Sequence, residues 1–386
     1  MKALIVSMDM LPGTERLMPW RTVVEVAKYL SAQPDIDGVE IYSGETPDTV
    51  EPERTYDGVR IVAGGKDAAS IAAYARSTSV GALFYPFAFR DIFKPLDDFS
   101  SLEIKKVAYI PGGIYPMAGV RALAAQGLYS AARPYLIENA VPRGIMLEKL
   151  AGAGFSHIIS FSPYTAAIVV KYGWPAARSV CALPGLDGFG SLEPDYSAVE
   201  RLGLQDSKFV LFSGAPAEVR GSGLLLKAYP HFLKANSDAR LVMLMRTDRS
   251  SSFARFNEAL ERLPDKSRLT VDFERLTPAQ LKGFFMKARA VVLPFIIIPS
   301  EIPLTYFEVM ACGTPVVTFH NGGTTHYLSE AILTVPSRTP KSLAGEMARV
   351  CNDDHLHRHL CDCALKLSSN HPDWAQSAQI WKTTLQ

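Results

Sequence analysis

Two carboxylates and a predicted helix start stand close together between residues 299 and 317. The acids are Glu301 and Glu308, and the apolar spacing predicts the helix over Leu304–Ala311. The apolar run Ala290–Ile298 precedes them and is typical of a fully buried strand. Because the first N–H groups of a helix have no intrahelical partner, a helix start at the carboxyl end of a strand can hold a phosphate. The alternative without chemistry is a buried strand, helix and strand with two surface acids.

A second candidate phosphate site follows the strand predicted over Phe209–Ser213. Gly214 lets the backbone approach an anion, and Arg220 can clamp phosphate oxygens with its planar guanidinium. The alternative is an ordinary turn with a solvent-facing arginine. Both candidate sites follow strands of one predicted sheet, and open α/β sheets bind ligands at the carboxyl ends of their strands. Together they favour a ligand that carries phosphate.

The elements that must position these residues alternate along the first half of the chain. Alternating strands and helices predict a parallel sheet with helices on both faces. Ser162 and Pro163 are typical of the cap and first position of a helix that runs to Lys171. The other predicted strands and helices of this half are Ala3–Ser7, Trp20–Leu30, Val39–Tyr42, Val59–Val62, Ala68–Ala75, Ala82–Tyr85, Lys106–Ile110 and Ile158–Ser160.

The second half repeats the pattern, so the fold class we predict is α/β, with two Rossmann-like doubly wound domains that face each other across a cleft. Its further predicted elements are Gly223–Ala235, Arg240–Met245, Phe253–Leu263, Leu269–Phe273 and Pro278–Ala288. Gly185–Gly188 is turn-rich, and Glu193–Asp195 begins a polar link to the next unit. We place an N-terminal domain at 1–192, a C-terminal domain at 193–367, and a helix that packs back on the first domain at 368–386. Gly188–Phe189–Gly190 is a candidate hinge.

Composition excludes several classes of protein. The chain has 386 residues, 48% of them hydrophobic and 20% charged, which is typical of a globular protein with two domains. With 40 basic and 39 acidic residues, net charge gives no argument for nucleic acid or an anionic membrane. The start of the chain is typical of a strand rather than of a signal peptide, and five scattered cysteines form no disulfide framework. We expect a cytoplasmic protein, with peripheral contact to the inner face of a membrane left open.

Two groups of residues resemble metal sites, and we expect neither to bind a metal. Asp35 and Asp37 form a D-x-D sequence between a predicted helix and strand, remote from the expected cleft. On a helix, His355, His359 and Cys363 would share a face, but zinc generally needs ligands from more than one segment. Incidental histidines on a helix are therefore the preferred interpretation.

Two segments of the chain resemble the retaining glycosyltransferases called "glycosyl transferases group 1" (family 4-like), which have the GT-B fold. Phe212–Tyr229 (FSGAPAEVRGSGLLLKAY) resembles their phosphate segment, and Ser300–Val317 (SEIPLTYFEVMACGTPVV) resembles their E-x7-E signature. The resemblance is specific from Ser160 to Gly323 and weak before that. Weaker matches to the family's other motifs lie at Ser160–Ala166, Pro184–Asp187, Pro278–Pro294 and Asn321–Gly323.

The resemblance implies roles for individual residues in binding a sugar nucleotide. Glu308 matches the glutamate that accepts hydrogen bonds from the ribose, and Arg220 replaces the lysine that contacts the diphosphate. The N–H groups of Leu304 and Thr305 would reach the distal phosphate. The full set implied to bind the donor is Gly214, Arg220, Phe273, Leu276, Leu304, Thr305 and Glu308, with Phe273–Leu276 near the base. Arg220 and Glu301 would be the catalytic residues.

The chain also departs from the family pattern. The family's first glutamate falls at Ser300, and Glu301 stands only seven positions before Glu308. Ala215 occupies the place of an arginine, so one of two expected phosphate cations is missing. The usual histidine of the first domain is absent from Ile110–Gly113. Gly112, Gly113 and Tyr115 are instead candidates for the acceptor side, against the alternative of a loop and a packed helix.

The interpretation we prefer is a GT-B glycosyltransferase that is metal-independent, needs no cofactor, and moves a sugar from a nucleoside-diphosphate-sugar to a glycan, lipid-linked or small-molecule acceptor with retention. Two alternatives remain. One is a degenerate homologue that binds a nucleotide sugar without transferring it, which Ala215 and the shifted Glu301 favour. The other is a sugar-nucleotide 2-epimerase, although the first domain lacks the expected cleft histidines and acids. The sequence identifies neither base, sugar nor acceptor.

Overall fold

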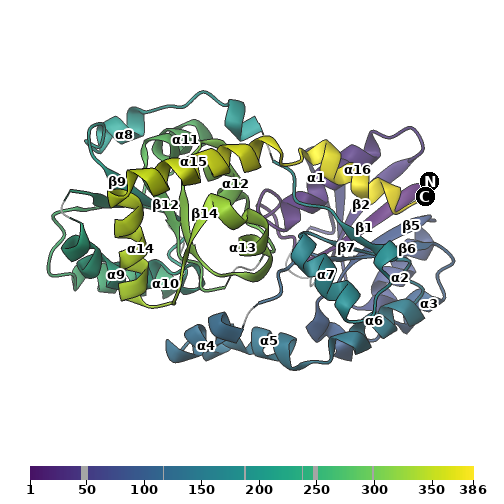
Figure 1. Ribbon diagram of the computed structural model, residues 1–386. Coiled ribbons are helices and arrows are strands. Elements are labelled where there is room, and N and C mark those ends of the chain that lie inside the picture. The colour runs from purple at the N-terminus through teal and green to yellow at the C-terminus, as the bar shows by residue number, and fades with distance from the viewer. Residues whose placement is uncertain (45–50, 116, 187, 237, 247–250, 298–299) are drawn as a thin grey trace.

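The computed structural model describes the chain apart from residues 45–50, 116, 187, 237, 247–250 and 298–299. Figure 1 shows two α/β lobes side by side, each with its own sheet between helices. The predictions made at Asp187, Ile298 and Pro299 fall outside the described residues.

The described part of the first lobe holds an eight-stranded sheet in the order β3-β4-β2-β1-β5-β6-β7-β8. Every pairing is parallel except β3 with β4. Its strands are β1 (Lys2–Met8), β2 (Gly38–Gly44), β3 (Glu53–Tyr56), β4 (Val59–Gly64), β5 (Ala82–Pro86), β6 (Lys105–Ile110), β7 (His157–Ser160) and β8 (Ser179–Cys181). Its helices are α1 (Trp20–Ser31), α2 (Ala68–Ser77), the 3₁₀ helix η2 (Phe89–Phe93), α3 (Asp97–Ser100), α4 (Met117–Ala125), α5 (Tyr129–Ala140), α6 (Arg143–Gly152) and α7 (Pro163–Lys171). The sequence did not predict the edge strand β3, because its residues are mostly exposed and polar.

The described part of the second lobe holds a six-stranded parallel sheet in the order β11-β10-β9-β12-β13-β14. Its strands are β9 (Phe209–Gly214), β10 (Arg240–Met245), β11 (Leu269–Asp272), β12 (Ala290–Leu293), β13 (Val316–Phe319) and β14 (Ile332–Val335). Its helices are α8 (Ser197–Arg201), the 3₁₀ helix η5 (Glu218–Arg220), α9 (Ser222–Ala235), α10 (Ser251–Glu261), α11 (Pro278–Lys287), α12 (Leu304–Ala311), α13 (Gly322–Leu328), α14 (Pro340–Asn352) and α15 (Asp354–Ser369). These two parallel sheets agree with the predicted fold class.

The strand predicted over Ala290–Ile298 is shorter in the structure. It ends at Leu293 as β12, and Pro294, which has no N–H to donate to a sheet, follows it. Beyond the proline, the N–H of Ile296 donates instead to the carbonyl of Val219, at 2.9 Å. Residues 294–297 of the apolar run therefore form a buried loop that packs against the other candidate phosphate segment at Val219.

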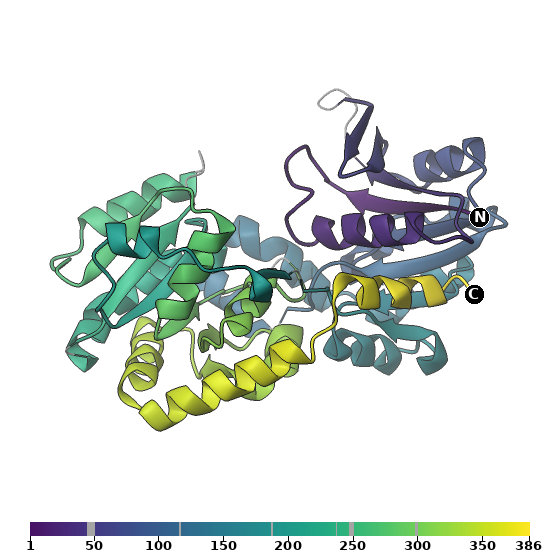
Figure 2. The same cartoon turned by 90° about the horizontal axis from the view of Figure 1, so that it is seen from above.

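The last helix, α16 (Trp374–Thr383), lies against α1 of the first lobe, as Figure 2 shows. Its Trp381 is completely buried beside the rings of Phe84, Tyr109 and Phe161. The helix therefore adds an aromatic side chain to the core of the first domain, after α15 has crossed the second.

Each sheet has a point where the strand order reverses. In the first sheet this switch point lies between β1 and β5, and in the second it lies between β9 and β12. Ligands of open α/β sheets bind in the crevice outside such a point. Among the helices that the structure describes, none is long and apolar enough to cross a membrane.

Candidate active site

The two candidate phosphate segments meet outside the switch point of the second sheet. Gly221, which directly follows Arg220, has a positive φ of 77°. A Cβ atom at this position would stand only 2.0 Å from the carbonyl oxygen of Pro294, so both the backbone conformation and the space require glycine. The glycine thus lets η5 lie against the loop that follows β12, and it brings Arg220 to that loop.

Arg220 is a desolvated cation at this switch point. Its guanidinium lies over the ring of Phe295, 5.7 Å from the centroid. Burial lowers its pKa, and the nearby charge of Arg246 lowers it further. Within the described residues no carboxylate forms an ion pair with Arg220. A half-buried cation without an acid partner among the described residues is costly, and binding an anion would relieve that cost.

Arg246 is a second cation that the sequence analysis missed. It comes directly after β10, and its N–H donates to the carbonyl of Gly214 at 3.0 Å. Its side chain is exposed, at the same sheet edge as Gly214 and Arg220. The signal that could have identified it was its position after a predicted strand, at the carboxyl edge where the ligand was expected.

Arg338 is a third cation at this edge and was also missed. It donates to the carbonyl of His320 at 2.5 Å and to Oδ1 of Asn321 at 3.1 Å. Asn321 in turn donates to the carbonyl of Phe295 at 2.9 Å. Burial lowers the pKa of Arg338. Phe295 therefore contacts Arg220 through its ring and Asn321 through its backbone carbonyl.

The predicted helix start is present where the sequence placed it. Helix α12 begins at Leu304, after Pro303, whose side chain provides no cap hydrogen bond. Leu304, Thr305 and Glu308 are all half-buried. The amide groups at this helix start and the Glu308 carboxylate one turn later thus lie on a surface that a ligand can reach.

Phe273 and Leu276 follow β11, at the far end of the same sheet edge. The ring of Phe273 packs edge-on against Phe253, with centroids 5.6 Å apart. Leu276 packs, half-buried, on the hydrophobic core of the second domain. Phe273 and Leu276 were predicted to lie near the base. They follow β11, and Arg246 follows β10, which lies between β11 and β9 in the sheet.

Glu301 lies between the domains rather than beside Arg220. Its carboxylate accepts hydrogen bonds from Oγ of Ser162 and from Oγ1 of Thr165, the latter at 2.8 Å, and both donors belong to the first turn of α7 or its cap. Its backbone carbonyl accepts from Oγ1 of Thr324 at 2.7 Å. Burial raises the pKa of Glu301 to about 7, although the two hydroxyl donors pull it down. The one-residue shift thus places this acid on the S-x-x-T turn of the first domain.

The second carboxylate oxygen of Glu301, Oε2, is buried and has no hydrogen-bond partner among the described residues. It faces Gly113, where a Cβ atom would stand 3.4 Å away. On the other side, a Cβ atom at Gly323 would stand 1.8 Å from Oε1, so a side chain there would displace the acid. Glycines on both sides therefore make room for the Glu301 carboxylate.

Gly113 belongs to the wall of a cavity of about 350 Å³ outside the switch point of the first sheet. Gly112 and Tyr115, the other acceptor-side candidates, also line it. The charged residues of its wall are of both signs: Asp9, Arg90, Asp91, Lys94 and Glu138. Arg90 pairs with Glu138, and Lys94 pairs with Asp91. The structure thus gathers the acceptor-side candidates in one cavity, with Glu301 behind its wall.

The candidate metal ligands lie away from both switch points. Asp35 pairs with Lys382 at 2.7 Å, and Asp37 pairs with the N-terminal amino group at 2.6 Å. Cys363 on α15 contacts His359 through sulfur, at 3.8 Å. No three His, Cys, Asp or Glu side chains in the part of the chain that the structure describes are arranged to hold a metal ion.

The comparisons with known proteins agree with this geometry. Residues 207–353 match the family Glycosyl transferases group 1. This match spans the second sheet and includes Arg220, Arg246, Glu301 and Glu308. It confirms the predicted resemblance and the prediction of a glycosyltransferase. No curated protein matches the chain.

Solved structures resemble the whole chain. A glycosyltransferase from Rickettsia africae has a TM-score of 0.70 at 14% identity, covering 100% of this chain and 98% of that one. Sucrose-phosphate synthase from Thermosynechococcus elongatus has a TM-score of 0.71 at 16% identity, covering 99% and 97%. Anabaena HepE, solved in complex with UDP and glucose, has a TM-score of 0.68 at 14% identity, covering 100% and 99%. At these identities the likeness shows the fold alone, and it confirms the predicted GT-B fold class.

Proposed function

We propose that this chain, which carries a glycosyltransferase group 1 domain, moves a sugar from a nucleoside-diphosphate-sugar to an acceptor in the first domain. The donor would bind outside the second switch point, and the acceptor would bind in the cavity outside the first. The observation that carries the proposal is Arg220, a half-buried cation that pairs with no acid among the described residues, at the place where an open α/β sheet binds its ligand. HepE, which shares the fold, was solved with UDP and glucose, and this supports a sugar nucleotide as the donor.

Each donor group has a proposed partner. Arg220 and Arg246 stabilise the diphosphate, and the free amides of Leu304 and Thr305 hold the distal phosphate at the start of α12. Glu308 accepts hydrogen bonds from the ribose hydroxyls, since each carboxylate oxygen can accept one O–H. Gly214 lets the backbone approach the phosphates, and Phe273 and Leu276 lie by the base.

The chemical step requires stabilising a departing nucleoside diphosphate, and positioned cations and amides do this. We propose retention at the anomeric carbon, with the leaving phosphate taking the acceptor proton in a front-face transfer. Glu301 would act beside this step, since its Oε2 atom faces the wall of the acceptor cavity. We expect no metal or other cofactor to be required, because Arg220 and Arg246 offer positive charge for the diphosphate.

The acceptor remains a glycan, a lipid-linked compound or a small molecule, and we propose a cytoplasmic protein that can contact a membrane surface. The first cavity carries paired charges and aromatic walls rather than a single-signed charge, which suits a hydroxyl-bearing acceptor better than a strongly charged one.

A second candidate function is a homologue that binds a nucleotide sugar without transferring it. Two observations favour it: Ala215 stands where the resemblance predicts an arginine, and Glu301 is bonded to Ser162 and Thr165 rather than exposed to a ligand. The sugar-nucleotide 2-epimerase interpretation has no such support in the geometry.

One experiment separates these functions. The purified chain is incubated with a panel of sugar nucleotides, with and without acceptor extracts, and release of nucleoside diphosphate is followed for wild type and Glu308→Ala. We expect acceptor-dependent release, and an increase of roughly tenfold or more in the KM for the donor in the variant, because two hydrogen bonds to a charged group are lost. Binding without release would support the degenerate homologue, and interconversion of donors would indicate the epimerase. No binding of any sugar nucleotide would contradict all three.

A further inference from the structure

Helix α5 carries exposed apolar side chains on its outward side, while Ala132 and Tyr135 pack inward. Tyr129, Arg133, Leu136 and Ile137 recur at the spacing of one helical face, and all four are exposed. The side chain of Tyr129 is 69% exposed and that of Leu136 is 44% exposed. The opposite side of the helix buries the acid Glu138. A surface helix normally buries its apolar stripe, so this face of α5 is built to contact something other than water.

The inward acid explains what holds α5 in this orientation. The Glu138 carboxylate accepts hydrogen bonds from the backbone N–H groups of Phe89 and Arg90, at 2.9 and 3.2 Å. Asn139 donates to the carbonyl of Tyr115 at 3.2 Å. These bonds tie the inward side of α5 to η2 and to the cavity wall, and they leave its outward apolar side chains free.

Neighbouring elements extend the exposed apolar face. Phe93, at the end of η2, is 81% exposed, and Ile145 and Tyr172 are exposed at the start of α6 and the end of α7. Arg143 joins these elements, since its guanidinium lies 5.3 Å from the ring centroid of Tyr172 and 5.5 Å from that of Phe89. We call this surface the α5–α7 face. It consists of Phe93, Tyr129, Leu136, Ile137, Ile145 and Tyr172.

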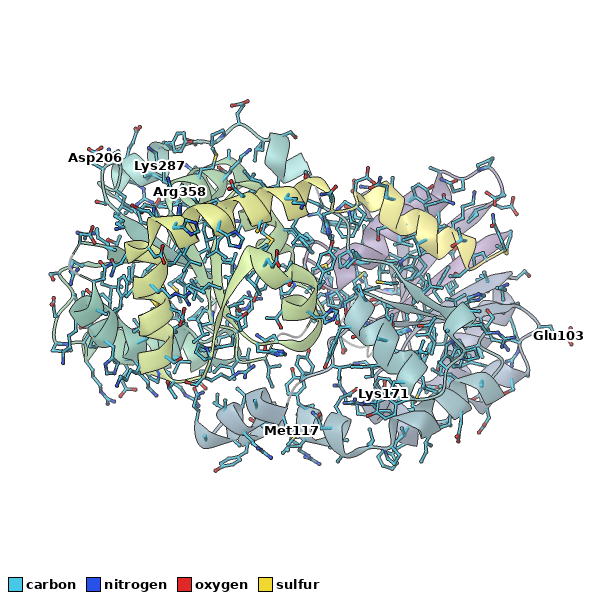
Figure 3. The ribbon with its side chains drawn as sticks, viewed as in Figure 1. Glu103, Met117, Lys171, Asp206, Lys287 and Arg358 are labelled. Atoms are coloured by element: carbon cyan, nitrogen blue, oxygen red, sulfur yellow. The ribbon has the colours of Figure 1, made fainter. Side chains whose placement is uncertain are left out.

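The charge around this face is positive, whereas the whole chain is almost neutral. Residues 117–172, which carry all of the face except Phe93, contain five basic residues against two acids, one of which is the buried Glu138; the segment after Phe93 adds Lys94 and the acids Asp97 and Asp98. The basic residues are Arg121, Arg133, Arg143, Lys149 and Lys171. In Figure 3, Met117 and Lys171 lie on the lower side of the molecule, and Lys287 and Arg358 lie on the upper side. Two copies that met through this face would bring like charges together, so charge complementarity favours an anionic occupant.

The occupant we infer is an anionic membrane surface. Apolar and aromatic side chains interleaved with Lys and Arg are the composition of helices that lie in a bilayer interface, where the apolar groups enter the acyl boundary and the cations meet anionic head groups. Arg90 of η2, together with Tyr135 and Glu138 of α5, also lines the 350 Å³ cavity, so the same elements form the face and the cavity wall.

We propose that the α5–α7 face docks on an anionic bilayer and so presents the first-domain cavity to a lipid-linked acceptor. The acceptor part of this proposal depends on the proposed function, whereas the docking part does not.

Co-sedimentation of the full-length chain with vesicles tests the docking. The vesicles contain phosphatidylcholine alone or phosphatidylcholine with phosphatidylglycerol. We expect sedimentation with the anionic vesicles. Leu136→Ser/Ile137→Ser should reduce partitioning by roughly 30-fold or more, because two side chains no longer enter the apolar boundary. Arg121→Gln/Arg133→Gln should reduce it by about 30-fold, since each cation near an anionic surface contributes about fivefold.

Matched control variants come from the opposite side of the molecule. Met286→Ser/Leu365→Ser removes two exposed apolar side chains, 46% and 50% exposed, from α11 and α15. Arg358→Gln/Lys366→Gln removes two exposed cations from α15. We expect wild-type partitioning for both controls and unchanged melting temperatures for all four variants. Wild type that stays in the supernatant, or α5 variants that sediment like the controls, would overturn the docking. So would a concentration-dependent dimer that the α5 substitutions abolish, or capture of an acidic protein in place of vesicles.

A second measurement isolates the acceptor. Release of nucleoside diphosphate is followed with a chloroform–methanol extract of membranes incorporated in the same vesicles, and with the water-soluble extract. We expect release with the lipid extract, and loss of that release in Leu136→Ser/Ile137→Ser although binding of the sugar nucleotide is unchanged. Release with the water-soluble extract alone would overturn the lipid-linked acceptor. Failure of wild type to bind any sugar nucleotide, with vesicle docking intact, would contradict the proposed function and leave the docking supported.

Discussion

The switch points of the two sheets have the same topology and different chemistry. Outside β1 and β5 lies a cavity of about 350 Å³ whose charges are paired, acid with base. Outside β9 and β12 stand Arg220 and Arg246, of which Arg220 is half-buried and pairs with no acid among the described residues. Each charge on the wall of the first crevice therefore has an ion-pair partner, Asp9 with Lys66 included, whereas the two arginines of the second crevice have none in the part of the chain that the structure describes. The difference indicates that the anionic substrate group belongs to the second domain.

Glu301 connects the two crevices. It belongs to the loop between β12 and α12, yet its carboxylate is bonded to α7 of the first domain and backs onto the cavity wall at Gly113. An acid in this position responds to how the domains meet. Separating Ser162 and Thr165 from it would expose Glu301 to water and lower its pKa toward the usual value.

The largest expected effect is that of Arg220→Ala, which removes the charge that distinguishes the second crevice. We expect kcat to fall by about 10²–10³, the usual cost of losing one positioned group that stabilises developing charge. Because Arg220 is desolvated and unpaired with acid, we expect the melting temperature to stay the same or to rise. Steady-state kinetics and a thermal melt measure both quantities.

Arg262→Ala is the matched control, because Arg262 is an exposed arginine of the same domain, bonded only along α10 to Glu258. It should leave kcat unchanged. If Arg220→Ala kept full activity, or if it lost activity only by unfolding, the two crevices would not differ in the way the charges indicate.

The next effect concerns Glu301 and stability. Its pKa of about 7 lies above the ordinary 4.5, so between these values the folded protein holds a proton that the unfolded chain has released. The free energy of unfolding should therefore fall as pH rises from 4.5 to 7, by about 3 kcal/mol in total from this group. Glu301→Gln, which stays neutral, should lack this contribution. Urea unfolding of both proteins across this range measures the difference.

Thr165→Val sharpens the same prediction. The variant removes the hydroxyl that donates to Glu301 and keeps the shape of the side chain. Since that bond favours the carboxylate, its loss should raise the pKa further and move the fall in stability to higher pH. Identical slopes for wild type and Glu301→Gln would contradict the burial of an ionisable acid between the domains.

The secondary structure was predicted correctly where local sequence signals and tertiary packing favour the same element. Helix α12 spans Leu304–Ala311 as predicted, and α7 begins after Ser162, whose Oγ accepts from the N–H of Thr165 at 3.1 Å. The extended strand after Ala290 was wrong beyond Leu293, because an apolar run indicates burial and does not by itself distinguish a strand from a buried loop. Helix α5 was missed because it carries apolar residues on both sides, Ala132 inward and Leu136 outward, so its sequence shows no single apolar stripe.

The sequence predicts which residues gather at the candidate site better than it predicts which of them are in contact. Gly214, Arg220 and the start of α12 gather at one sheet edge because parallel strands share a carboxyl edge, which the sequence order already implies. The approach of Gly221 to Pro294 and the bonding of Glu301 to α7 depend on how the loop after β12 and the two domains pack, and no local pattern encodes that. Arg246 could have been found from its place after a strand.

Arg246→Gln is expected to have a smaller effect than Arg220→Ala, because the Arg246 side chain is exposed and its field is screened by solvent. We expect the KM for the donor to rise by about tenfold with little change in kcat, and the effect to weaken at high salt. If Arg246 compensates for Ala215, then adding Ala215→Arg to Arg246→Gln should restore the KM. Arg262→Gln, at an exposed arginine that pairs with Glu258 of α10, is the control.

The smallest effect tests the first crevice. Ala88 lines the first cavity, and Ala88→Leu would add three carbon atoms to its space without changing its charge. We expect the KM for the acceptor to rise by roughly tenfold, since one added group in a tight pocket shifts binding by that order, while binding of the sugar nucleotide stays unchanged. The reverse result, weaker donor binding with unchanged acceptor KM, would assign the donor to the first domain. It would show that the anion binds beside the paired charges of the first cavity rather than beside Arg220 and Arg246.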